Sequence, residues 1–187
     1  TMNRLFGEGH WDLNELTINY RNPQEVSDLA SRFAQNEGLY ISTVNAVRAL
    51  PDSVSRHVVD DMKALLTVTS NQAAQLANHF VSADGTGRIA IICPDDLIKP
   101  VREAVRHRLS SLMAPSEYQR LIDQPEWDEQ ISVCGTEMVK GLEFDAVIVI
   151  EPGRIEDDAP SRLVAASDLY VATTRPTQKL VIVRTKE

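Results

Sequence analysis

RIAIIC, residues 88–93, is an apolar stretch that lies between Gly87 and Pro94. A run of this kind, without polar alternation, is typical of a strand buried on both faces of a parallel sheet. Short β-branched runs follow at residues 131–134, 146–150 and 179–183. Helical patterns separate most of these runs, and strands that alternate with helices form crossover units. We therefore expect an α/β fold with a parallel sheet flanked by helices.

The N-terminal region predicts another strand followed by a helix. LTINY at residues 16–20 is rich in β-prone side chains. Asn22 suits the N-cap of the helix and Pro23 its first position, with Glu25 placed for a capping box. Gly38 is expected to end this helix.

The middle and the C-terminal part predict one more strand and three helices. ALLTV at residues 64–68 is expected to be a strand, and Ser70 to cap the helix that follows it. The helix after RIAIIC is expected to reach about Leu112, with Pro100 in its first turn. The last helix is predicted over residues 161–174.

The composition is that of an ordinary globular chain of 187 residues with an acidic balance. Its 27 Asp+Glu against 19 Lys+Arg give a formal net charge of -8, which argues against a dedicated basic nucleic-acid module. A local contact strip remains compatible with this charge. No apolar run reaches the roughly 18 residues of a membrane span, and no signal peptide is recognisable. Because Cys93 and Cys134 both lie in apolar segments, we expect reduced cysteines and a cytoplasmic protein.

The organisation of the chain predicts one domain. Residues 1–12 are expected to form an irregular lead-in, and residues 13–187 a single α/β domain. Methionine stands second, at Met2, so we expect a tag remnant or a piece cut from a longer protein. The acidic residues 156–158 are expected to form a solvated loop.

Several chemistries lack their sequence patterns. His10, His57, His79 and His107 are scattered without metal-ligand spacing, so no metal site is expected. The chain has no G-x-S-x-G motif. Gly85-Thr86-Gly87 precedes a strand, whereas a phosphate loop follows one, so this segment predicts a turn. The chain also lacks G-x-x-x-x-G-K-[ST] and is not expected to hold the β- and γ-phosphates with Mg²⁺ by itself.

Two arginines stand at junctions suited to anion binding. Arg21, in Asn19-Tyr20-Arg21, lies where a predicted strand leads into a helix, and ligands of open α/β sheets bind at such strand ends. It also fits an ordinary surface position. Arg175 ends the helical segment LYVATTR at residues 169–175. It is either a cation placed for phosphate or a residue that complements the helix dipole.

KGLEFD, residues 140–145, directly precedes the apolar run at 146–150. Gly141 would allow close approach of the backbone to a ligand. Glu143 is a short-range acceptor suited to a ribose hydroxyl. The alternative interpretation is a polar turn that contains a charged pair.

Taken in order, N-Y-R, K-G-L-E-F-D and L-Y-V-A-x-T-R-x-x-Q-K-L resemble motifs IV, V and VI of the UvrD/Rep family of superfamily I helicases. The resemblance covers about residues 13–183. It implies the second, C-terminal RecA-like domain of a motor, a P-loop NTPase fold that lacks its own Walker A loop. By this resemblance Arg21 and Arg175 reach the γ-phosphate of ATP held with Mg²⁺ by an N-terminal RecA-like domain, and Arg175 is the arginine finger. Further implied contacts are those of Lys140, Gly141 and Glu143 with nucleotide and of Gly135 and Thr136 with single-stranded DNA.

The sequence departs from the family pattern in three respects. Glu137 lies where family motif V commonly has a Thr-x-His run, and its charge is poorly suited to a DNA phosphate. Pro176 follows the finger arginine, where the family commonly has a small residue. About 120 residues separate motifs IV and V, which leaves little room for a large inserted domain. This short form is similar to the HelD-like and RecD-like branches.

Three classes of function remain under consideration. The leading hypothesis is the C-terminal motor half of an ATP-dependent DNA helicase or translocase, which by itself is inactive. The second is a non-catalytic, motor-derived module that binds a protein such as RNA polymerase. The third is a nucleotide-binding enzyme complete in one domain, against which the missing phosphate loop argues.

Overall fold

The computed structural model describes residues 18–36, 45–82, 85–122, 130–157 and 162–186. Its centre is a five-stranded, all-parallel sheet with the strand order β3-β7-β6-β4-β5. The strands are β3 (Val54–Val59), β4 (Ile89–Ile92), β5 (Ile131–Cys134), β6 (Phe144–Ile150) and β7 (Pro176–Thr185). Four of these strands contain the apolar runs that predicted them. The parallel α/β fold expected from the sequence is therefore confirmed.

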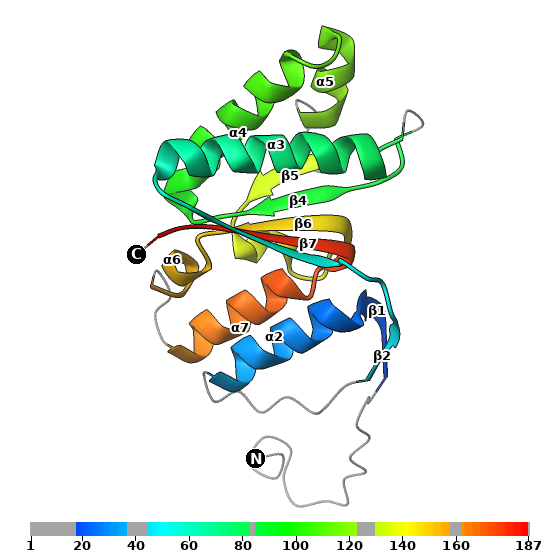
Figure 1. Cartoon of the computed structure of the whole chain (residues 1–187), viewed down its shortest axis with the longest axis vertical. Helices are drawn as coiled ribbons and strands as arrows, with labels where there is room; N and C mark the ends of the chain where they lie inside the picture. The colour runs from blue at the N-terminus through cyan, green and yellow to red at the C-terminus, as the bar shows by residue number, and fades with distance from the viewer. Residues whose placement is uncertain (1–17, 37–44, 83–84, 123–129, 158–161, 187) are drawn as a thin grey trace, which may run out of the picture.

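Helices cover both faces of this sheet. On one side lie α3 (Met62–Phe80) and α4 (Asp95–Ser110), and on the other α2 (Gln24–Asn36) and α7 (Arg162–Thr173) (Figure 1). Alternate residues of β6 point into the two cores: Ile148 packs with α3 and α4, and Val149 with α2 and α7. This three-layer arrangement around a parallel sheet is consistent with a RecA-like fold, and it explains why the central strands are apolar at successive positions.

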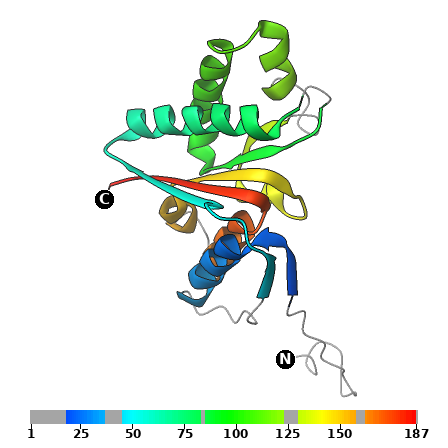
Figure 2. The same ribbon diagram turned by 45° about the vertical axis from the view of Figure 1, so that its right-hand side comes forward.

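A second, two-stranded parallel sheet lies at the side of the molecule (Figure 2). It pairs β1 (Ile18–Pro23) with β2 (Asn45–Arg48). The sequence predicted Arg21 where a parallel strand leads into a helix, and Arg21 indeed lies near the end of β1, which is parallel to β2 and precedes α2. This strand belongs to the small sheet and not to the main one. The end of β1 instead meets the amino end of β7, through bonds described below. Residues 1–12, predicted as a lead-in, lie outside the described residues.

The predicted strand at residues 64–68 is instead part of helix α3. Asp61 caps this helix, its carboxylate accepting from the backbone N–H of Ala64 at 2.7 Å. Ser70, predicted as the cap, lies inside the helix and donates to the carbonyl of Thr67 at 3.1 Å. The buried residues of α3 recur at helical spacing, which decides between helix and strand for an apolar run of this kind: they are Leu65, Thr69, Ser70, Ala73, Ala74, Leu76 and Ala77.

Two predicted caps of α2 have other partners. The helix begins at Gln24, and the side chain of Asn22 bonds to the β7 turn rather than to the helix. The carboxylate of Glu25 accepts from Ser53 Oγ at 3.1 Å and from the backbone N–H of Val54 at 3.3 Å. The capping-box prediction is therefore wrong: Glu25 ties α2 to the first residue of β3. The predicted end at Gly38 lies outside the described residues.

Strands β2 and β3 and helices α5 (Pro115–Ile122) and α6 (Pro152–Asp157) were not predicted. β3 is an edge strand whose residues alternate in exposure, and Arg56 and His57 interrupt its apolar pattern. Two of the three residues expected in a solvated acidic loop, 156 and 157, belong to α6, and residue 158 lies outside the described part. Pro100 lies in the second turn of α4, not the first, because the helix begins at Asp95.

Two smaller predictions are confirmed. Gly85 and Gly87 both have a φ of +88°, as a turn before β4 requires. Cys93 is buried, Cys134 is partly buried, and both thiols are free. Among the described helices, none combines the length and the apolar character needed to cross a membrane.

Candidate functional site

Three of the five residues that the sequence singled out for nucleotide chemistry, Arg21, Glu143 and Arg175, meet at the amino edge of the main sheet. Strands β6 and β7 are neighbours, and Phe144 is paired with Pro176 at their first residues. Glu143 and Arg175 directly precede these residues, so they lie side by side. The backbone N–H of Phe144 donates to the carbonyl of Arg175 at 3.2 Å, which closes the edge.

The guanidinium of Arg175 is held by the protein's own oxygens. Its Nε donates to the carbonyl of Val171 at 3.0 Å, and Nη1 donates to the carbonyl of Leu142 at 3.2 Å. Nη2 donates to Thr174 Oγ1 at 3.4 Å. Burial, and then the nearby charge of Arg21, lower the pKa of Arg175, while Glu143 raises it. A guanidinium stays charged in spite of such a shift, so Arg175 presents a fixed, partly desolvated cation.

Arg21 reaches the same place from the small sheet and forms an ion pair with Glu143. The two side chains are 41% and 49% exposed, so the pair by itself contributes little to stability. Its importance lies in position: two cations and one carboxylate from three distant segments form a cluster with a net positive charge. A cluster of this kind is suited to an anion with several oxygens, such as a phosphate chain.

Asn22 and Arg48, which the sequence did not identify, join the small sheet to the Arg175 turn. Asn22 Nδ2 donates to the carbonyls of Thr174, at 2.9 Å, and of Pro176, at 2.7 Å. Arg48 Nη1 donates to the carbonyls of Arg21, at 3.2 Å, and of Thr177, at 2.8 Å. Neither role has a sequence signal, because both depend on where β1 packs against β7.

Lys140 and Gly141, predicted to contact nucleotide, have roles in the structure of the turn before β6. Lys140 Nζ pairs with Glu137 at 2.6 Å and with Asp168 of α7 at 3.2 Å. These hydrogen bonds raise the pKa of Lys140. Gly141 has a φ of +83°, and a Cβ there would meet no atom within 4 Å. Glycine is therefore required by the backbone angle rather than by a close approach, and the charged-pair interpretation of this turn fits Lys140.

Asp145 organises the same edge, a role that the sequence did not reveal. One carboxylate oxygen accepts from the backbone N–H of Arg88 at 2.9 Å, and the other from Gln178 Nε2 at 2.9 Å. These bonds join the amino ends of β4, β6 and β7. Side-chain hydrogen bonds, as well as the backbone hydrogen bonds between β6 and β7, therefore hold the edge at Arg175 and Glu143.

Gly135 and Thr136, predicted to contact DNA, lie at the opposite edge. They follow the carboxyl end of β5, roughly 20 Å from the arginines by the rise of the intervening strand. A Cβ at Gly135 would lie 2.9 Å from a carboxylate oxygen of Asp95. Asp95, Asp96 and Glu137 make this neighbourhood acidic, which disfavours a phosphate there.

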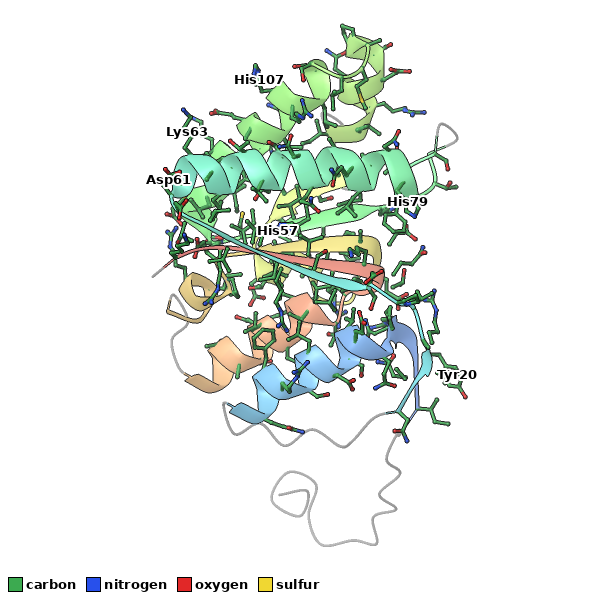
Figure 3. The ribbon with its side chains drawn as sticks, viewed as in Figure 1. Tyr20, His57, Asp61, Lys63, His79 and His107 are labelled. Carbon is green, nitrogen blue, oxygen red and sulfur yellow. The ribbon has the colours of Figure 1, made fainter. Side chains whose placement is uncertain are left out.

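Three histidines, His57, His79 and His107, are labelled in Figure 3 and lie on separate elements. His57 belongs to β3, His79 to the end of α3 and His107 to α4, while His10 lies outside the described residues. Across the described ranges, no group of three or more His, Cys, Asp or Glu is placed to hold a metal ion.

The residues at the amino edge fit one part of a nucleotide. Two guanidiniums can bind phosphate oxygens, and the Glu143 carboxylate can accept a hydrogen bond from a ribose hydroxyl if Arg21 turns away from it.

Comparisons with known proteins show the fold. No family model matches the sequence, and the curated proteins include no significant match to it. Among solved structures, the chain is similar to the C-terminal domain of a possible DNA helicase from Lactobacillus plantarum WCFS1, with a TM-score of 0.58 and 19% sequence identity. The match covers 89% of this chain and 88% of that one. At this identity the likeness shows a shared fold, and the fold is that of a domain from a protein described as a helicase.

Proposed function

We propose that this chain is the C-terminal, second RecA-like domain of an ATP-dependent DNA helicase or translocase of the UvrD/Rep type in superfamily I. In this proposal ATP and Mg²⁺ are held mainly by an N-terminal RecA-like domain. The present chain contributes Arg21 and Arg175, and single-stranded DNA is moved along both domains. In this proposal the chain is a short form without a large inserted domain, similar to the HelD-like and RecD-like branches. The site of action is the cytoplasm.

The observation that carries the proposal is the convergence of Arg21, Glu143 and Arg175. They come from β1, from the turn before β6 and from the end of α7, and each lies in a different motif of the resemblance. Arg21 and Arg175 are close enough for the charge of Arg21 to lower the pKa of Arg175, and Glu143 offsets part of this repulsion. The likeness in fold to a C-terminal domain from a possible DNA helicase supports the same assignment.

Each side chain has a distinct part in the proposed reaction. When bound between the domains, ATP supplies a γ-phosphoryl group whose transfer to water drives their movement. Arg175, held by two backbone carbonyls, stabilises the negative charge that develops on the transferred group. When the cleft closes, Arg21 leaves its half-exposed ion pair with Glu143 and binds the γ-phosphate. Glu143 then accepts from the ribose.

The decisive experiment measures ATP hydrolysis by the protein that contains this chain together with an ATP-holding domain. Arg175→Ala should lower kcat by about 10³-fold or more, because an arginine finger contributes roughly 10³–10⁵ in rate. The present chain alone should not hydrolyse ATP. Near-normal turnover of Arg175→Ala would contradict the assignment of Arg175 as the arginine finger. Robust hydrolysis by the chain alone would contradict the proposal that another domain holds the ATP.

A second candidate, a non-catalytic module that binds a protein such as RNA polymerase, is kept because of one observation. Ile18, Tyr20 and Val47 are 51%, 70% and 60% exposed on the small sheet, and Tyr20 projects away from the body (Figure 3). Large exposed side chains of this type suit a protein contact. A pull-down with nucleic acid digested distinguishes the candidates: capture that is lost in Tyr20→Ser but kept in Arg175→Ala favours the module.

A further inference from the structure

The side-chain amide of Asn22 is bonded entirely to the surroundings of the two arginines. Asn22 is 3% exposed, and its Nδ2 donates to the carbonyls of Thr174, at 2.9 Å, and Pro176, at 2.7 Å. Its Oδ1 accepts from Asn19 Nδ2 at 3.0 Å, which sets the orientation of the amide. The two carbonyls that Asn22 binds are those immediately before and after Arg175.

Backbone N–H groups hold the turn at Arg175 to α7: that of Thr174 donates to the carbonyl of Tyr170 at 3.0 Å and that of Arg175 to the carbonyl of Ala172 at 3.5 Å. Pro176 has no N–H to offer to the neighbouring strand. Three successive carbonyls of the turn are acceptors: that of Arg175 accepts from Phe144 at 3.2 Å, and those on either side accept from Asn22. Asn22 is therefore the side chain of the small sheet that binds the carbonyls on both sides of Arg175.

The same residue is the chain neighbour of Arg21. Asn19 Oδ1 accepts from the backbone N–H of Arg21 at 2.9 Å and of Asn22 at 3.1 Å, so the backbone around both is set by one small turn. A change at Asn22 therefore acts both on the backbone next to Arg21 and on two carbonyls of the Arg175 turn.

We propose that Asn22 is a positioning residue that holds Arg21 and Arg175 as one unit for binding phosphate. This inference rests on the proposed function. A shift of about 1 Å in a positioned group can lower a rate by about 10²-fold, and two guanidiniums on separate elements need a rigid link to act on the same group.

The test compares kcat and KM for ATP in the protein that joins this chain to an ATP-holding domain. Asn22→Ala should lower kcat by about 10²-fold with a much smaller change in KM, since the fault lies in the transition state. In the Arg175→Ala background, Asn22→Ala should lower kcat by much less than the 10²-fold expected in the wild type, because only the placement of Arg21 is left to lose. Asn22→Asp, which keeps the shape but presents a carboxylate to the two carbonyls, should be at least as slow as Asn22→Ala.

Gln130→Ala is the matched control. Gln130 is 5% exposed, and its Nε2 likewise donates to two backbone carbonyls, those of Thr86 at 3.1 Å and Gly87 at 3.4 Å. It lies outside the arginine cluster, so its removal should disturb the fold in a similar way and leave kcat near normal.

The outcomes separate the two proposals. If Arg175→Ala keeps normal turnover, the proposed function fails. If Arg175→Ala is inactive while Asn22→Ala is normal, the positioning role of Asn22 is overturned. The same holds if the two losses in kcat multiply fully in the double variant. In both cases Arg175 remains assigned as the arginine finger.

A second measurement, made on the present chain, does not depend on ATP hydrolysis and so remains informative if a variant impairs the motor for another reason. The Nε–H of Arg175 is bonded to the carbonyl of Val171, and its proton exchange can be followed by NMR. Asn22→Ala should speed this exchange by at least about tenfold, whereas Gln130→Ala should not change it. Unchanged exchange in Asn22→Ala would overturn the inference.

Discussion

Arg21 and Glu143 form an ion pair that joins the end of β1 to the turn before β6. Each is about half exposed, and Arg175 lies beside them. The Glu143 carboxylate therefore offsets part of the repulsion between two guanidiniums while it occupies one of them. Because both side chains are accessible to a ligand, the effect of the Glu143 charge on anion binding can be measured.

Glu143→Gln should strengthen the binding of pyrophosphate to the chain. Removal of one negative charge about 7 Å from the anion is worth about 0.6 kcal/mol in water, a factor of roughly three in affinity. Isothermal titration calorimetry at low salt gives the two dissociation constants. Glu103→Gln makes the same charge change on an exposed position of α4, and an equal gain in that variant would contradict a local effect.

Gly141→Ala should lower the free energy of unfolding by about 1–2 kcal/mol, because a side chain is strained at a φ of +83°. Urea denaturation measures the change. Gly153→Ala is the control, since Gly153 lies in α6 with open space around it and no positive φ. There alanine should be neutral or stabilise the protein by about 0.5–1 kcal/mol. Equal effects in both variants would show that the backbone angle at Gly141 is not required.

Alanine variants of Gly85 and Gly87 distinguish the cost of backbone strain from the cost of steric overlap within one turn. Both have a φ of +88°, but a Cβ at Gly85 meets no atom within 4 Å, whereas one at Gly87 would lie 1.9 Å from the carbonyl oxygen of Phe80. Gly85→Ala should cost about 1–2 kcal/mol. Gly87→Ala should cost at least about 1 kcal/mol more, because the overlap is with backbone. Thermal or urea unfolding that ranks them in the other order would contradict the described turn.

The stability of the protein should fall at alkaline pH through Cys93. Burial, with smaller contributions from Cys134, Asp95 and Asp96, raises the pKa of the Cys93 thiol from 9.0 to about 12. Above pH 9 the unfolded chain loses this proton and the folded chain keeps it, so the folded state is favoured less as the pH rises. The loss should be about 1 kcal/mol between pH 8 and pH 10. Unfolding of wild type and Cys93→Ala at both values measures it, and parallel pH slopes would contradict the assignment.

The sequence predicted the centre of the fold well because the strands there are buried on both faces. β4, β6 and β7 each contain an uninterrupted apolar run, and such a run has few other stable environments in a chain of this size. β5 is an edge strand interrupted by Ser132, and its β-branched residues predicted it instead. The edge strand β3, with Arg56 and His57 in its middle, has no such pattern. Residues 64–68 were misassigned for a related reason: a short apolar run does not distinguish strand from helix until its neighbours are included.

The candidate site was only partly predictable. Arg21, Glu143 and Arg175 were chosen from their motifs, and the structure brings them together, but Lys140 and Gly141 serve the turn itself and Gly135 and Thr136 lie at the other edge. Asn22 was interpreted as a helix cap, because local sequence contains no information about a carbonyl on a strand formed much later in the chain.

The sequence by itself determined the class of the fold and the charged residues that we propose for phosphate binding, since hydrophobic periodicity and charge are local properties of the chain. Only the tertiary structure decided which of those residues act together. The placement of β7 beside β6 brings Arg175 to Glu143, and the bonds from Asn22 bring Arg21 to both. The physical reason is that strand order and the satisfaction of buried polar groups depend on contacts between distant segments, which no local pattern specifies.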